Sequence, residues 1–273
     1  MVTLNIFKKL KEKKNDILKN AYDINGKPDY NYYIMSKSEL NMYRIVGILL
    51  FFLIGYTFYK SVIISLIFSL FGLFFPEYMY TKKLDRRKKA LNSQFKDMLY
   101  SISSSLMAGK SVETAFFDSK EELYILYPDE NTDIIRELGY ITNGLKLGDT
   151  IESLLESLAK RSHDEDIENF ADVFISCKRT GGISSEIIKI TTDVITEKIE
   201  IKRDIASSLS EKKFEQKAMS GLMLLVILGL SYLSGDYMDV MFTTVLGRFY
   251  MTIALIIFII SYVVGEKIMN IEV

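Results

Sequence analysis

Apolar residues are concentrated in two parts of the chain. Residues 45–80 are almost continuously apolar, and a second apolar region covers residues 219–235 and 243–265. As one helix, the first region would be about 54 Å long at ~1.5 Å per residue, which exceeds the ~30 Å hydrocarbon core of a bilayer. Two short helices joined by a tight hairpin at Lys60 fit that thickness better. The two regions together predict four membrane-spanning helices.

The stretch between them, residues 90–217, has apolar residues at helical spacing. The predicted buried faces are Leu91, Phe95, Met98, Leu99, Ile102 and Leu106; Ile151, Leu154, Leu155, Leu158 and Ala159; Ile167, Phe170, Ala171, Phe174 and Ile175; and Ile187, Ile190, Val194, Ile201, Ile205 and Leu209. Further helices are expected near 111–126 and 131–143. The last helix has no stop signal from about residue 184 and is expected to continue into the third span. The pattern predicts an all-α integral membrane protein, with four transmembrane helices and an antiparallel helical bundle between the two pairs.

Glycines mark the expected turns of this bundle. They are Gly109, Gly148, Gly181 and Gly182. Glycine readily takes the left-handed conformation that ends a helix. After Gly109, Ser111 is the predicted cap of the next helix. After Gly148, the predicted cap is either Thr150 or Asp149. The sequence therefore predicts tight turns between helices at these corners.

Basic residues flank the first apolar region on both sides. Nine Lys and Arg against five Asp and Glu precede residue 45, and residues 81–90 carry six Lys and Arg against one Asp. Because Lys and Arg near span ends stay in the cytoplasm, both flanks are expected there. The connection between the third and fourth spans has only Asp236 and Asp239 as charges. Both termini and the bundle are therefore predicted to be cytoplasmic, in the cytoplasmic (inner) membrane.

These observations divide the chain into five parts. They are a basic cytoplasmic N-terminal arm (1–43), a transmembrane hairpin (44–80), the cytoplasmic helical bundle (81–217), a second transmembrane hairpin (218–265) and a cytoplasmic tail (266–273). More than forty mostly polar residues precede the first apolar run, which does not fit a cleavable signal peptide. The arm either is solvated or lies on anionic lipid or a partner.

Composition removes several kinds of chemistry. The chain has 273 residues, 49% of them hydrophobic, but only one Cys and one His. Cys177 has no partner for an internal disulfide, and with His163 it cannot complete a closed zinc site. Residues 108–111 (AGKS) end like a phosphate-binding loop, but Ser104 occupies the position of its first Gly and a helix precedes it. His163 and the acidic residues at 164–168 are more simply explained by solvation and helix capping. No catalytic residue, cofactor, metal ion or nucleic-acid partner is predicted.

The order of these features resembles a known family. The segments that carry the resemblance are residues 106–111 (LMAGKS), residues 154–161 (LLESLAKR) after Gly148, residues 178–182 (KRTGG) and the helix that ends at residues 211–220 (EKKFEQKAMS). With the layout of two spans, a helical domain and two more spans, they are similar to the type II secretion system F-domain family. The similarity is greatest to platform subunits of the tight-adherence (Tad, or Flp) pilus machinery, and it covers roughly residues 90–235.

The resemblance implies a non-enzymatic membrane platform. In that family the cytoplasmic domain engages a hexameric secretion ATPase, and the membrane part helps to move pilin subunits from the bilayer into a growing filament. Larger relatives carry two copies of the helical domain, whereas this chain has one. It is therefore expected to act as a homo-oligomer or with a sister platform subunit, in pilus assembly or in protein secretion.

The charge of the middle region indicates what kind of partner would bind, and its loops indicate where. Residues 90–217 contain 16 Lys and Arg against 24 Asp and Glu, a balance of −8, which would attract a partner with a basic face. Loops on a rigid bundle commonly carry recognition. Lys146 in the 144–149 loop, and His163 and Asp164 in the 162–168 loop, are therefore the candidate docking residues for the ATPase.

A membrane transporter or permease subunit with a regulatory helical domain is the alternative. Such proteins usually place ionisable groups deep in their spans, because these groups define the transport pathway. The predicted span centres contain no Asp, Glu, Lys or Arg, apart from Lys60 at the hairpin and Arg248 near an end. This pattern argues against a transporter.

Overall fold

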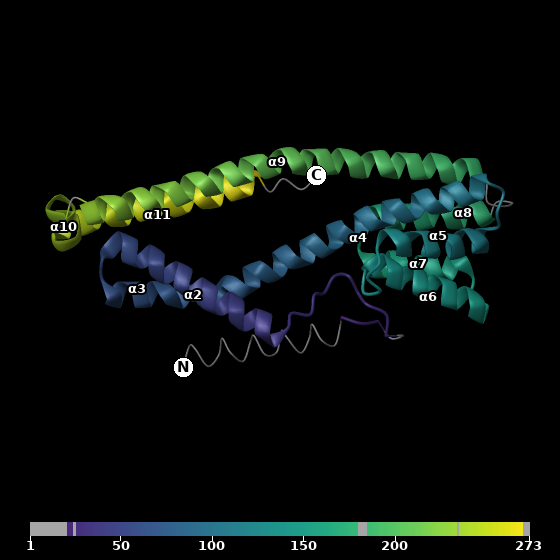
Figure 1. The fold of residues 1–273 in the computed structure, drawn as a ribbon, viewed down its shortest axis with the longest axis horizontal. Coiled ribbons are helices and arrows are strands. Elements are labelled where there is room, and N and C mark those ends of the chain that lie inside the picture. The colour runs from purple at the N-terminus through teal and green to yellow at the C-terminus, as the bar shows by residue number, and fades with distance from the viewer. Residues whose placement is uncertain (1–20, 24–25, 180–184, 234, 270–273) are drawn as a thin grey trace. The chain divides into compact units, whose positions relative to one another are not determined.

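The computed structural model describes residues 21–23, 26–179, 185–233 and 235–269, and these residues form helices without a β-strand. The helices are α2 (Lys37–Tyr59), α3 (Val62–Ser69), the 3₁₀ helix η1 (Leu70–Phe74), α4 (Phe75–Met107), α5 (Val112–Leu126), α6 (Asp133–Leu147), α7 (Ile151–Ser162), α8 (Glu165–Arg179), α9 (Ser185–Leu233), α10 (Gly235–Thr243) and α11 (Val245–Met269) (Figure 1). An isolated β-bridge joins Tyr22 and Pro28. The predicted all-α class is confirmed.

Four helical stretches are long and apolar enough to cross a membrane. They are Lys37–Tyr59, Val62–Met107, Ser185–Leu233 and Val245–Ile268. The predicted break at Lys60 is present, because this residue ends α2 with a left-handed φ of 43°. The second stretch continues to Met107 without a break, and α9 is continuous through residues 212–218 as predicted. The short helix α10 stands where a plain loop was expected between the last two spans.

The chain divides into two compact units. Unit 1 comprises Met1–Ile34 and Thr81–Ile201, and unit 2 comprises Met35–Tyr80 and Lys202–Val273. The end of the predicted N-terminal arm therefore belongs to the helical core rather than to a separate segment. Within that end, Ala21 and Tyr30 are buried. The sequence did not indicate this packing, because residues 21–34 have no helical or alternating apolar pattern.

The core of unit 1 is built from the apolar faces of α4 to α8, with Ile188, Ile195 and Ile199 of α9. All six residues predicted on the first face, from Leu91 to Leu106, are buried. Aromatic rings join the helices edge to face, with centroids 5.7 Å apart for Phe95 and Phe170 and 6.5 Å apart for Phe116 and Phe174. These arrangements are favourable beyond the burial of apolar area. The helix periodicity therefore identified most of this core.

The face predicted for α9 is wrong. Ile187, Val194 and Ile201 are 45%, 60% and 53% exposed, whereas the buried apolar residues described on this helix are Ile188, Ile195 and Ile199. Both sets lie at helical spacing, so α9 carries two apolar stripes about 100° apart around its axis. The seven-residue repeat does not identify the stripe that packs on the bundle, because that depends on contacts with the other helices.

In unit 2, glycines set the closest helix approach. A Cβ on Gly47 would lie 2.6 Å from the carbonyl oxygen of Gly72, and one on Gly55 would lie 3.0 Å from Ser65 Cα. Such small residues let backbones approach closely, which is how helices associate in a bilayer. Helix α2 therefore packs tightly against the α3–η1 segment.

Polar contacts join the helix ends of unit 2. At one end Lys60 Nζ lies 3.4 Å from Asp239 Oδ1, and at the other the Tyr78 hydroxyl donates a hydrogen bond to Glu266. The turn after α2 and the turn region between α9 and α11 therefore lie at the same end of unit 2. This arrangement agrees with two hairpins that enter from one side.

Candidate functional site

Two corners of unit 1 lie together at one of its ends. Lys146 Nζ, in the last turn of α6, lies 5.4 Å from the centroid of the Phe117 ring near the start of α5. Lys178 Nζ, near the end of α8, donates a hydrogen bond to Glu152 Oε2 in the first turn of α7 at 2.8 Å. We call this region, formed by residues 107–111, residues 146–152 and Lys178, the glycine end.

Both described glycine corners have the geometry expected of them. Gly109 and Gly148 have left-handed φ values of 80° and 92°. The amide of Asp149 donates to the carbonyl oxygen of Gly144 at 3.0 Å, which closes the α6 terminus in the usual six-residue loop. Ser111 Oγ accepts a hydrogen bond from the Thr114 amide at 3.2 Å and so caps α5.

The other glycine-end features follow the same pattern. Thr150 Oγ1 caps α7 by accepting a hydrogen bond from the Ser153 amide at 3.4 Å.

Gly181 and Gly182, the third predicted corner, lie outside the described residues. The segment that resembles the end of a phosphate-binding loop joins α4 to α5, and Lys110 Nζ within it donates to Asp118 Oδ2 at 2.7 Å. No strand precedes this segment, so the loop lacks the setting that phosphate binding requires.

The surface of the glycine end is apolar as well as charged. Leu147 is 85% exposed and Met107 is 56% exposed, directly beside the two corners. Lys110, Lys146 and Lys178 lie near them. Exposed apolar side chains next to charged groups on rigid helix ends form a surface on which a protein partner can bind.

His163 and Asp164 lie at the opposite end of α7. This helix has twelve residues, which places them about 18 Å from the Lys146 corner. His163 has a left-handed φ of 49°, and its Nε2 lies 3.2 Å from Asp29 Oδ1. Asp164 Oδ1 accepts hydrogen bonds from the amides of Asp166 and Ile167, at 3.0 and 3.2 Å. The structure therefore separates the candidate docking residues into two places, and at the second place Asp164 caps α8.

A buried ion pair that the sequence did not indicate lies near this second end. Arg161 Nη1 and Nη2 donate to the two carboxylate oxygens of Glu137 at 2.6 and 2.5 Å. The Tyr30 hydroxyl donates to the same carboxylate at 2.7 Å, and Arg161 Nη1 donates to the Pro28 carbonyl at 3.0 Å. Glu137 and Tyr30 are fully buried. The pair thus fixes residues 28–30 on the bundle.

Burial and hydrogen bonding shift the pKa values of two members of this cluster, Tyr30 and Arg161. Burial, with the charge of Glu137, raises the pKa of the Tyr30 hydroxyl, so Tyr30 remains a donor. Burial alone would lower the pKa of the Arg161 guanidinium, but the hydrogen bond and charge of Glu137 outweigh it and raise that pKa. A bidentate pair of this kind is strong and directional. The sequence signal that could have indicated this ion pair was Glu137, a charged residue among the apolar positions of α6.

Among the described residues, no group of three or more His, Cys, Asp or Glu side chains is placed to hold a metal ion. Cys177 is buried on α8. Comparisons of the chain with protein-family models, with curated proteins and with solved structures found no match. We therefore take the glycine end as the candidate functional site, namely a surface that a protein partner could bind.

Proposed function

We propose that this chain is a non-enzymatic membrane platform subunit of a Tad or type IV pilus, or of a type II secretion-like machine. It couples a cytoplasmic secretion ATPase to pilin assembly or protein export. The observation that carries this proposal is the continuity of α4 and α9, each of which contains residues of both units without a loop between them. A continuous helix can transmit a displacement that a flexible linker would absorb.

Orientation is part of the proposal. We propose that the helical core of unit 1 and both termini lie in the cytoplasm, and that Lys60 and Asp239 lie on the outer side of the inner membrane. The charge bias of the flanking segments supports this orientation, and so does the contact between Lys60 and Asp239 at one end of unit 2. Single cysteines at 60, 163 and 239 in a Cys177→Ser background test it. An impermeant maleimide should label positions 60 and 239 in intact cells, and labelling at 163 would exclude the orientation.

Unit 2 provides the surface for lipid and for pilin subunits. Large apolar side chains on its helices are exposed, including Ile63 at 74% and Leu225 at 68%. In the proposed platform these residues face lipid, pilins, a sister platform subunit or a second copy of the chain. The single helical core in this chain, where larger relatives of the resembled family have two, supports assembly with such a partner.

We place the ATPase contact at the glycine end rather than at the His163 corner. Asp29 lies against His163, and Asp164 is committed to capping α8. At the glycine end, in contrast, Leu147 is almost fully exposed. Of the three docking residues predicted from the sequence, Lys146 lies at this end, and we propose that it contacts the ATPase.

Co-purification of the full chain with the secretion ATPase of the same cell tests this function. Leu147→Asp should reduce the amount of captured ATPase about tenfold, because it puts a charge into an apolar contact. Ile125→Asp is the matched control, since Ile125 is 84% exposed in the last turns of α5 at the other end of that helix. If the unchanged chain captures no ATPase, the platform function is contradicted. Equal loss with both variants would contradict only the placement of the contact.

A further inference from the structure

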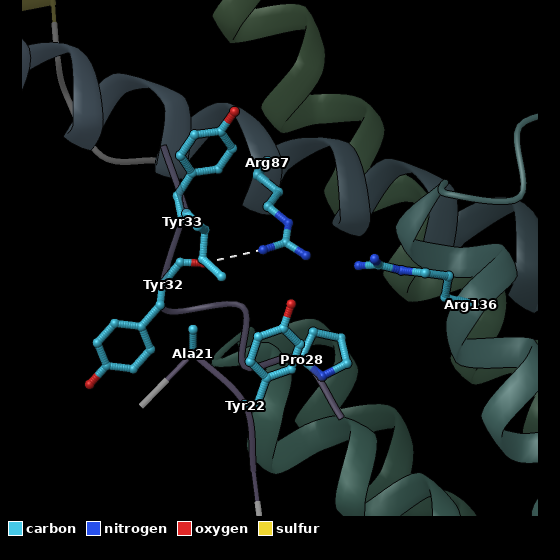
Figure 2. Close-up of a pocket in the computed structure, with 8 residues that line it drawn as sticks. Ala21, Tyr22, Pro28, Tyr32, Tyr33, Arg87 and Arg136 are labelled. Atoms are coloured by element: carbon cyan, nitrogen blue, oxygen red, sulfur yellow. Dashed lines mark hydrogen bonds between the residues drawn. The ribbon is translucent and has the colours of Figure 1, made fainter. Parts of the chain in front are cut away.

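A pocket with a volume of about 180 Å³ opens where residues 21–34 meet α4 and α6 (Figure 2). It is lined by Ala21, Tyr22, Pro28, Tyr32, Tyr33, Ile34, Arg87 and Arg136. Two of these residues are arginines, and none is acidic. The pocket therefore has a positive lining, which neither the sequence nor the proposed function accounts for.

The two arginines share one carboxylate. Arg87 donates to both oxygens of Asp133, with distances of 2.8 Å from Nε and 2.7 Å from Nη2. Arg136 Nη2 also donates to Asp133 Oδ1, at 2.7 Å. Two guanidinium charges thus face a single negative charge. The excess is one positive charge, close to the basic run at residues 82–89.

Arg136 also has an unused donor. Its Nε atom is buried and makes no hydrogen bond to any residue that the structure describes. Buried polar groups are nearly always paired, so an unpaired one calls for an explanation. An arginine offers only donors, and therefore the missing partner must be an acceptor.

Tyr22 supplies a third donor from a different part of the chain. In Figure 2 its hydroxyl points into the space bordered by the Arg87 and Arg136 guanidinium groups, whereas the Tyr32 ring points away from it. Tyr32 contributes its carbonyl oxygen, which accepts a hydrogen bond from Arg87 Nη1 at 3.1 Å. Tyr22 is 51% exposed, so the pocket opens to solvent beside it.

We propose that this pocket binds a phosphate group. Guanidinium groups match the oxygens of a phosphate in shape and charge, and a tyrosine hydroxyl adds a neutral donor. Donors from three separate elements, α4, α6 and the N-terminal segment, suit a tetrahedral anion better than a planar carboxylate. The bound anion would neutralise the excess charge of Arg87 and Arg136.

The phosphate has two sources with the same chemistry. One is the headgroup of an anionic lipid, since Ile34 precedes the start of α2 by three residues and Arg87 follows Tyr80 by seven, next to both ends of the first apolar hairpin. The other is free phosphate or a soluble phosphate ester. Binding of either would hold residues 21–34 on α4 and α6, and it does not depend on the platform function.

Isothermal titration calorimetry on the full chain in a neutral maltoside detergent tests the proposal. The probes are inorganic phosphate and phosphatidylglycerol with short acyl chains, each at an ionic strength matched with chloride. At least one probe should bind, and Arg136→Gln and Tyr22→Phe should each weaken that binding about tenfold or more, because each removes a hydrogen bond to a charged group. The probe that binds more tightly identifies the source.

Two controls keep the result interpretable. Arg203→Gln removes the same charge from an exposed position on α9 and should leave binding unchanged. Tyr22→Phe keeps the ring and does not touch Asp133, so it separates loss of the site from loss of the fold if Arg136→Gln lowers the melting temperature. Absence of binding with both probes would overturn the proposal. So would equal affinities for the unchanged chain and for the Tyr22→Phe variant.

Discussion

The described interior of unit 1 consists of large apolar side chains around the ion pair of Glu137 and Arg161, whereas the closest helix contacts described in unit 2 are made by glycine. Unit 1 buries Phe95, Phe116 and Phe170 completely. Unit 2 leaves residues such as Leu49 and Ile63 more than half exposed. In water, the burial of apolar area drives helices together. In lipid it does not, and close packing of small residues takes its place.

This difference is the one we expect if, as proposed, unit 1 lies in water and unit 2 in lipid. The comparison also predicts which substitutions are damaging in each unit, and the four that follow are ordered from the largest expected effect to the smallest.

Loss of the buried carboxylate should have the largest effect. Glu137→Gln leaves Arg161 buried without its counter-charge, which should cost about 3–5 kcal/mol of unfolding free energy. Urea unfolding of the full chain in detergent, followed by circular dichroism, measures this cost. In the double variant Glu137→Leu with Arg161→Leu, most of the stability should return, because neither charge is then left buried alone. A cost below 1 kcal/mol for Glu137→Gln would show that the pair does not hold residues 28–30 in place.

The close helix contact in unit 2 should be the next most sensitive. Gly47→Ala puts a methyl group against the carbonyl oxygen of Gly72, and overpacking of this kind costs about 1–3 kcal/mol. Gly229→Ala is the matched control, since a Cβ there meets no atom within 4 Å and alanine favours the helix. Thermal melting in lipid nanodiscs compares the two variants. Equal melting temperatures would mean that glycine does not set the approach of these helices.

The glycine corners should show an intermediate effect that depends on backbone conformation alone. Gly148 has a φ of 92° and free space around a Cβ position, so Gly148→Ala should destabilise unit 1 by about 1 kcal/mol. Gly139→Ala, in the middle of α6 with equal free space, should instead stabilise it by ~0.5–1 kcal/mol. Opposite signs in chemical denaturation confirm the corner, and a shared sign would refute it.

The exposed ion pair at the glycine end should have the smallest effect. The hydrogen bond from Lys178 holds the pKa of the Glu152 carboxyl below its ordinary value of 4.5. A lowered pKa means that the stabilisation is present above about pH 4.5 and is lost as the pH falls through the lower value of the folded state. Glu152→Gln should therefore cost only about 0.2–1 kcal/mol at pH 7, and less in high salt. An equal cost at pH 3 and pH 7 would contradict this assignment.

Local signals account for what the sequence predicted well. Helical spacing of Phe95, Phe170 and their neighbours located the core of α4 to α8, and the break at Lys60 was visible as a charge within an apolar run. Gly109 and Gly148 were identified because only a few residue types readily take a left-handed conformation. All of these features depend on neighbours in the sequence.

Long-range contacts account for what it missed. The packing of Tyr30 onto Glu137 joins residues 107 positions apart, and no local pattern announces it. The choice between the two stripes of α9 likewise depends on the surface that the other helices present. The pocket beside Arg136 combines three elements and could be found only once the structure had brought them together.

Photo-crosslinking in cells tests the central claim, that the glycine end of a membrane platform contacts a secretion ATPase. A crosslinking amino acid is placed at Lys146, at His163 or at Ile125 of the otherwise unchanged chain, and captured proteins are identified by mass spectrometry. We expect the ATPase to be captured from position 146 and not from positions 163 or 125. Capture from 163 alone would move the docking surface to the other end of α7. If no position on unit 1 captures the ATPase, the platform function is contradicted.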